Sequence, residues 1–143
     1  MGARLAILAA AFSQLLLLAL GELPPATLGL SGLTHAAIPI AVSASLAALL
    51  RRYLPPNPFI YTLGAGFLGG ILAILAAMLA TALIYHAGGV YPWDTLWHKY
   101  LQTLPIIAYP EGFINGVFAT AMVAFHPNLL ATFNPNDYLK ETP

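Results

Sequence analysis

Three polar side chains stand in otherwise apolar stretches of this sequence, and their types are those that bind protons or cations. They are His35, Glu111 and Asn115. Glu111 and Asn115 are four residues apart, so a helix would place both on one face. Ionisable groups inside a membrane are costly, and they often mark a pathway for ions or protons. These residue types therefore allow a polar intramembrane site built from all three.

A structural role for Glu111 is the alternative, and it is the one that we expect. Pro110 suits the first position of a helix, because proline lacks an N–H and its φ is already close to the helical value. The carboxylate of Glu111 could then accept hydrogen bonds from free amides at that helix start, such as those of Phe113 and Ile114. The sequence leaves both roles open.

No local motif points to catalysis or to a bound cofactor. The four histidines show neither HxxxH nor HExxH spacing, and the absence of cysteine excludes thiolate ligands and cysteine nucleophiles. His35 and Glu111 are the two conceivable metal ligands, and we expect no complete metal site from them. No glycine-rich phosphate loop and no Ser-His-Asp set can be argued. We therefore expect a protein that is not an enzyme and has no cofactor.

The composition indicates what must position these residues. The chain has 143 residues, of which 59% are hydrophobic and 7% are charged, with a mean hydropathy of +0.80. Soluble domains carry about 25% charged residues, so this chain could not cover a surface that faces water. Its net charge is zero and it has no basic patch, so nucleic acid is not an expected partner. The lipid bilayer is.

We expect an all-α integral membrane protein, because backbone hydrogen bonds in lipid must be satisfied within the chain. Residues 1–143 are predicted to form a single transmembrane domain with a cytoplasmic tail at 126–143. The predicted bundle has four spans, at about 5–20, 33–50, 59–85 and 101–125. The fourth span is expected to be broken near Pro105–Pro110, with its second half beginning at Pro110.

The distribution of basic residues predicts the orientation. Four spans place Arg4, Arg51, Arg52 and Lys140 on one side of the membrane and Lys99 on the other. The positive-inside rule then puts both termini in the cytoplasm. We expect a multi-pass protein of the bacterial inner (cytoplasmic) membrane.

Two further patterns concern packing and anchoring. Trp93, Trp97 and Tyr100 belong to the apolar face of a short amphipathic helix, which we expect to lie on the outer surface of the membrane as part of an aromatic belt. The third segment carries small residues at close-packing spacing, among them Gly66, Gly69 and Gly70. Such residues let the backbones of two helices approach closely, so we expect helix packing within the bundle there.

Three stretches carry a resemblance to a known family. They are "AYPEGFINGVFATAMVAFHPNLLATFNPNDYL" (108–139), "LRRYLPPNPFIYTLGAGFLGG" (50–70) and "YPWDTLWHKYL" (91–101). Together they resemble the small proteobacterial permease proteins of energy-coupling factor (ECF) ABC transporters, which are relatives of the CbiM-type cobalt and nickel permeases. The resemblance implies a substrate-binding membrane subunit that works with a coupling subunit and ATPases.

The chain also departs from that family. Relatives are longer, so the resemblance implies that their first helices are missing here. In the metal-transporting relatives, the metal is bound by the free N-terminus, by a histidine directly after the first methionine and by a further histidine. Gly2 stands at that position in this chain. Two functions therefore remain open: a membrane permease component with an incomplete metal site, or an accessory, structural subunit of a larger membrane complex.

Overall fold

The computed structural model describes residues 3–130 and 132–134, and the regular structure of these ranges is helical. The α-helices are α1 (Ala3–Ala19), α2 (Leu28–Gly32), α3 (Ile38–Tyr53), α4 (Gly69–Ala87), α5 (Trp93–Lys99) and α6 (Leu104–Phe125). Two π-helical segments continue them, η2 (Leu33–Ala37) and η3 (Ile60–Leu68), and short 3₁₀ turns lie at Pro25–Thr27, Leu101–Thr103 and Pro127–Leu129.

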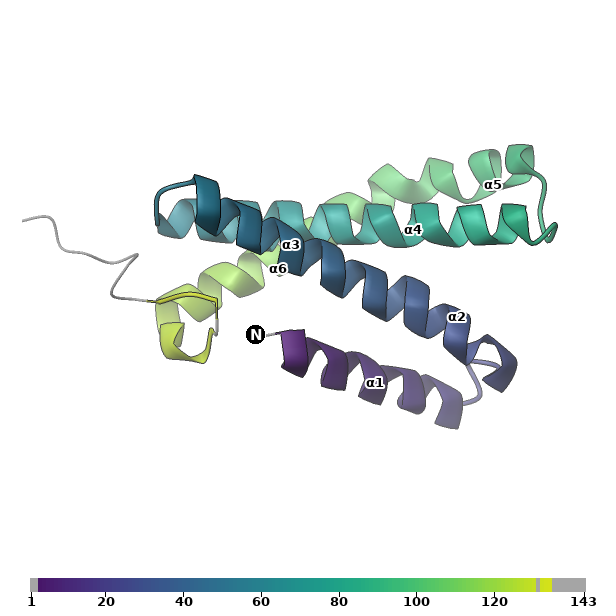
Figure 1. The fold of residues 1–143 in the computed structure, drawn as a ribbon, viewed down its shortest axis with the longest axis horizontal. Helices are drawn as coiled ribbons and strands as arrows, with labels where there is room; N and C mark the ends of the chain where they lie inside the picture. Colours follow the sequence, from purple (N-terminus) through teal and green to yellow (C-terminus); the bar gives the residue numbers. More distant parts are fainter. Residues whose placement is uncertain (1–2, 131, 135–143) are drawn as a thin grey trace, which may run out of the picture.

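Successive long helices lie beside one another and run in opposite directions (Figure 1). The unit formed by η3 and α4 lies at the centre of the packing, with α3 on one side and α6 on the other. The first helix, α1, packs against α2, η2 and α3. The start of α1, the end of α3 and the end of α6 lie toward one end of the molecule, and α5 lies at the other (Figure 1).

Three of the described helices are long and apolar enough to cross a membrane. They are the continuous stretches Pro25–Tyr53, Ile60–Ala87 and Trp93–Phe125, and Arg4–Ala19 is a shorter apolar helix. Composition therefore identified the class of protein correctly. The stretch Pro25–Tyr53 corresponds to the second predicted span and begins upstream of its expected start at residue 33, because Leu28–Gly32 continues the same helix despite its two glycines.

The predicted break at Pro105–Pro110 is wrong. Helix α6 runs without interruption from Leu104 to Phe125, with Pro105 in its first turn and Pro110 inside it. A helix interior tolerates a proline in a membrane protein where neighbouring groups compensate for the lost N–H. The chain instead changes direction earlier, at the 3₁₀ turn Leu101–Thr103 that separates α5 from α6.

Glycines bring the centre of the bundle together. A Cβ atom built on Gly66 would lie 2.8 Å from the Cβ of Ala119, and one built on Gly70 would lie 2.9 Å from Asn115 Nδ2. On the facing helix, a Cβ on Gly112 would lie 2.9 Å from the backbone oxygen of Phe67. The η3–α4 and α6 backbones are therefore in direct contact along a seam that no larger residue could form, as small-residue packing in lipid requires.

Two clusters of buried side chains close the ends of the bundle. Near α5, Leu96 and Leu101 pack on Met78 and Ala82 of α4, so α5 is held against the end of that helix. At the opposite end, Leu130 and Phe133 pack on Tyr61 of η3. The rings of Tyr61 and Phe133 meet edge to face, with their centroids 5.1 Å apart. The segment after α6 is therefore anchored to the start of η3.

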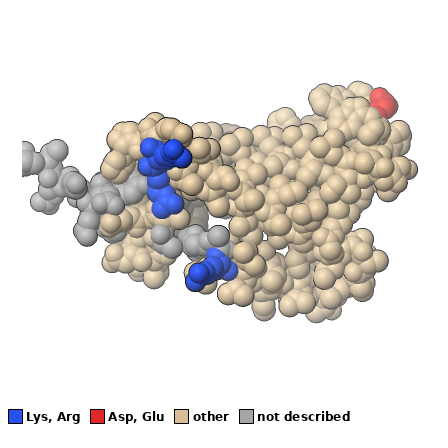
Figure 2. Space-filling view, in the orientation of Figure 1, with Lys and Arg blue, Asp and Glu red and all other residues tan. Residues whose placement is uncertain are grey.

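Charged side chains avoid the middle of the face seen in Figure 2. The Lys and Arg side chains visible there gather at the end where α1 begins and α3 ends, and the acidic side chain lies at the α5 end. The tan surface between them is uncharged over the length of the helices. This distribution matches that of a protein whose middle lies in hydrocarbon.

The seam predicts opposite outcomes for two neighbouring glycines. We expect Gly66→Ala to cost about 1–3 kcal/mol of folding free energy, because its methyl group would overlap Ala119 across a packed backbone. Gly69→Ala is the matched control, since its nearest non-local atoms lie 3.8 Å away. Thermal unfolding in one detergent should show a lower Tm for the first variant and an equal or higher Tm for the second. Equal Tm values for the two variants would contradict the seam.

Candidate functional site

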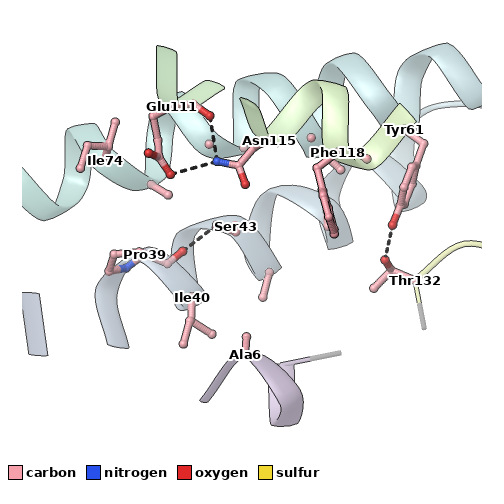
Figure 3. A pocket seen from close by; sticks show the side chains of 18 of the residues that line it. Ala6, Pro39, Ile40, Ser43, Tyr61, Ile74, Glu111, Asn115, Phe118 and Thr132 are labelled. Atoms are coloured by element: carbon pink, nitrogen blue, oxygen red, sulfur yellow. Dashed lines mark hydrogen bonds between the residues drawn. The ribbon is translucent and has the colours of Figure 1, made fainter. Parts of the chain in front are cut away.

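A groove of about 740 Å³ runs between α3 on one wall and η3, α4 and α6 on the other. His35, Glu111 and Asn115, which come from segments far apart in the sequence, all line it. Ala6 of α1 also lines it, and Pro39 and Ser43 of α3 face the turn of α6 that holds Glu111 (Figure 3). The structure therefore brings the three predicted polar residues to one groove.

Glu111 and Asn115 form a pair on α6. The side-chain amide of Asn115 donates to the backbone oxygen of Glu111, 2.8 Å away, and to its carboxylate oxygen Oε1, 3.0 Å away (Figure 3). The same amide packs directly against the backbone of Gly70, in the space that a side chain at this position would fill. Both N–H bonds of the amide are used in this way, so its orientation is fixed and Oδ1 is left without a hydrogen-bond partner among the described residues.

This geometry excludes the capping role for Glu111. The residue lies in the interior of α6, two turns after Leu104, and the amides of Phe113 and Ile114 therefore belong to a continuing helix rather than to a helix start. The Glu111 side chain is exposed on the surface of the described chain and lines the groove. The expectation of a cap is wrong because it depended on the break at Pro110.

His35 is held by its neighbour. Thr34 is fully buried in the π-helical segment η2, and its hydroxyl donates to the backbone oxygen of Leu30, 3.0 Å away. The same oxygen lies 2.8 Å from Nδ1 of His35. Because a hydroxyl has a single hydrogen, the Thr34 oxygen must accept the second bond, so Nδ1 of the imidazole carries a proton. In the neutral ring Nε2 is then the acceptor.

The remaining polar groups of the groove lie along α3 and at one end. Ser43 donates its hydroxyl to the backbone oxygen of Pro39, 2.7 Å away. Arg51, in the last turn of α3, lines the end of the groove near Tyr61 and Thr132. The hydroxyls of Tyr61 and Thr132 are 2.7 Å apart and share one hydrogen bond. The charged guanidinium thus lies at the end of the groove that is remote from α5.

The polar residues of the groove are not spaced as the ligands of a metal ion are. In the described part of the chain, no group of three or more His, Asp or Glu side chains lies close enough together to hold a metal ion. His35 and Glu111 line the same groove, but they stand on helices that form separate walls. The groove therefore offers spaced polar atoms to a ligand rather than a compact set of metal donors.

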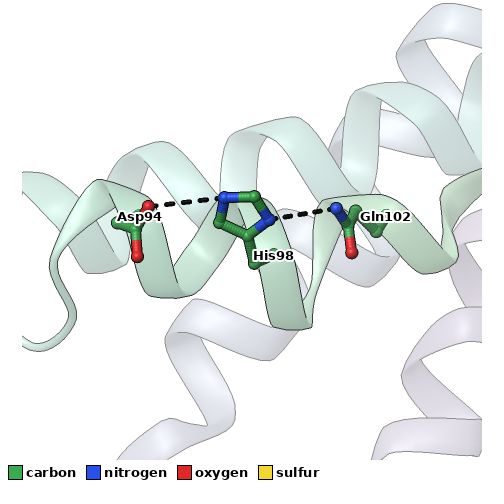
Figure 4. A network of polar contacts seen from close by, with 3 residues as sticks. All are labelled: Asp94, His98 and Gln102. Carbon is green, nitrogen blue, oxygen red and sulfur yellow. Dashed lines mark hydrogen bonds and ion pairs between the residues drawn. The ribbon is translucent and has the colours of Figure 1, made fainter.

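A second polar network lies on α5 (Figure 4). His98 stands between Asp94 and Gln102, with its Nε2 3.4 Å from Asp94 Oδ1 and its Nδ1 3.0 Å from Gln102 Nε2. The His98 and Asp94 side chains are 57% and 87% exposed. Trp93 of the same helix contacts the ring of His86, and Trp97 is exposed. This network therefore lies on the exposed surface of α5 and of the 3₁₀ turn that follows it.

Two features of the site were not identified from the sequence. Gly112 and Gly116 form the α6 side of the seam, and their spacing is itself a small-xxx-small pattern that signals close packing. The hydrogen bond between the Tyr61 and Thr132 hydroxyls joins residues far apart in the chain, so no local sequence pattern could predict it.

The model of one protein family matches residues 1–129 of this chain; it is CbiM, described as the cobalt uptake substrate-specific transmembrane region. The matched range includes all three polar residues of the groove and both sides of the glycine seam. No curated protein and no solved structure matches the chain.

The hydrogen bonds of Thr34 predict the tautomer of the neutral His35 ring. Thr34→Val keeps the volume but removes the acceptor of the Nδ1 proton, so we expect a loss of about 1 kcal/mol of stability and a mixture of imidazole tautomers. Thr34→Ser should restore the single tautomer. ¹⁵N NMR of labelled histidine measures this directly. Identical His35 nitrogen shifts in the Val variant and the unaltered chain would contradict the arrangement.

Proposed function

This chain belongs to the CbiM family of cobalt uptake substrate-specific transmembrane regions, and on that premise we propose that it is the permease component of an ECF-type uptake system for cobalt or nickel. The observation that carries the proposal is the family match over residues 1–129. Its substrate would be the divalent metal ion. Catalysis of a chemical reaction is no part of this function.

The groove is the proposed polar intramembrane site. Glu111, Asn115 and His35 line it, and Glu111 is the acidic residue of α6. Polar groups at such positions usually face a cavity and contribute to an ion pathway. What supports the assignment is that residues from η2 and from α6 converge on one groove although their helices are separated in the sequence by α4.

The partners proposed for the chain are a transmembrane coupling subunit and ATPases. The sequence carries no glycine-rich phosphate loop, so energy from ATP would have to be supplied by another subunit. Large apolar side chains are exposed along the described helices, for example Phe12, Ile106 and Phe118. In a membrane such faces are available both to lipid and to other membrane subunits.

We propose four spans within a single transmembrane domain, with both termini in the cytoplasm of a bacterium and α5 at the outer surface of its inner membrane. Helix α1 has 17 residues and is therefore about 26 Å long, close to the roughly 30 Å hydrocarbon thickness. The arginines gather at the end of the bundle opposite α5 (Figure 2). The positive-inside rule assigns that end to the cytoplasm.

A second candidate function is that of an accessory subunit in a larger membrane complex, without a metal site of its own. The groove favours this candidate, because the described residues include no group of three metal-ligating side chains that lie close together. The two candidates share the fold and differ in whether cobalt accumulates.

Cysteine labelling tests the topology, because the chain has no cysteine of its own. In spheroplasts, a thiol reagent that does not cross membranes should label Gly88→Cys and spare Thr142→Cys, which lies outside the described residues. Permeabilised cells provide the control, since both variants should then be labelled. The opposite pattern in intact spheroplasts would reverse the orientation.

Cobalt accumulation tests the function. Cells that contain the chain with its coupling subunit and ATPases should accumulate ⁵⁷Co²⁺ at least tenfold above cells that contain the partners alone. Glu22→Gln, in the exposed turn after α1, should leave the uptake unchanged. If the chain co-purifies with membrane partners but adds no uptake, the accessory function is correct and the permease proposal fails.

A further inference from the structure

The middle of the groove presents hydrogen-bond acceptors while its donors are occupied. Asn115 uses both amide hydrogens on Glu111, Ser43 uses its hydroxyl hydrogen on Pro39, and His35 uses its Nδ1 hydrogen on Thr34. What remains for a ligand is a set of lone pairs. They are those of the Glu111 carboxylate, Asn115 Oδ1 and His35 Nε2, none of which has another partner among the described residues.

The middle of the groove also favours a positively charged ligand. Glu111 contributes a carboxylate, and the cationic side chain that lines the groove is Arg51. Arg51 lies two turns beyond Ser43 on α3, which is roughly 12 Å along the helix. The stretch between Pro39 and Ser43 on one wall and Glu111 and Asn115 on the other is therefore anionic and accepts hydrogen bonds (Figure 3).

A ligand that fits such walls must be positively charged and must donate several hydrogen bonds in different directions. A divalent cation with its water shell has both properties, because every coordinated water turns its hydrogens outward. Water-mediated contacts of this kind are nearly as favourable in enthalpy as direct hydrogen bonds. A bare ion would instead need protein donors about 2.0–2.2 Å away, and the described residues contain no group of three that could supply them.

The size of the groove agrees with a hydrated ion. Each water molecule takes about 30 Å³ in the liquid, so a first shell of about six waters needs roughly 180 Å³. The groove, at about 740 Å³, has room for the ion with its entire shell. The fixed orientation of Asn115 over Gly70 also means that the acceptors need little rearrangement when the ion arrives.

We infer that the groove binds its divalent cation in the hydrated form, with Glu111, Asn115 and His35 accepting hydrogen bonds from coordinated water rather than ligating the metal. The inference deepens the proposed function, because the proposed substrate class is the ion that would occupy this groove. In this proposal the groove binds the ion while its shell of coordinated water is still complete.

An exchange-inert complex tests this directly. Cobalt(III) hexaammine has a fixed shell of N–H donors and cannot be ligated by protein atoms. With the full chain in nanodiscs, equilibrium dialysis should show one hexaammine bound per chain. Mg²⁺, which also dehydrates reluctantly, should compete for that site. Glu111→Gln should weaken hexaammine binding at least tenfold, whereas Glu22→Gln, a change of equal charge outside the groove, should leave it unaltered.

Glu111→Asp is the second variant, since it keeps the charge and should keep binding within a few-fold of the unaltered chain. Binding of Co²⁺ without binding of hexaammine would overturn the inference, because it would require direct ligation. Hexaammine binding that is equally strong in Glu111→Gln would also overturn it. Failure of the proposed function would instead appear as absent ⁵⁷Co²⁺ uptake in a chain that still binds hexaammine.

Discussion

The direct contact between the backbones of η3–α4 and α6 is the constraint on which the rest of this structure depends. In lipid, apolar side chains gain nothing from leaving the solvent, so helices associate where their surfaces fit most closely. Gly66 and Gly70 on one side and Gly112 and Gly116 on the other allow that fit. The seam fixes the rotation of α6, and this rotation turns Glu111 and Asn115 toward α3 and the groove.

Part of this arrangement could be predicted from composition and local pattern. The low charge content and the long apolar segments identify a helical membrane protein, and small residues in the third segment indicate where a helix can approach closely. The break at Pro110 was predicted incorrectly, because a rule from soluble helices was applied where the fold supports a continuous α6. The capping role of Glu111 was wrong for the same reason.

Other features depend on tertiary packing and have no local signal. The π-helical segments η2 and η3 each place an extra residue in a turn, and such turns are often found at functional sites. In η2 this turn carries buried Thr34, which orients His35. That His35 and Glu111 share one groove follows from how α3 and α6 pack on α4, and spacing along the chain could not reveal it.

In the proposed site, the groove recognises a hydrated cation through acceptors on opposite walls. X-ray absorption spectroscopy of Co²⁺ bound to the full chain in nanodiscs examines the first coordination shell itself. For the ion whose binding depends on Glu111, we expect a shell of water oxygens alone, without the multiple-scattering pattern of an imidazole ring. A spectrum with imidazole scattering from that ion would contradict it, because His35 or another histidine would then be a direct ligand.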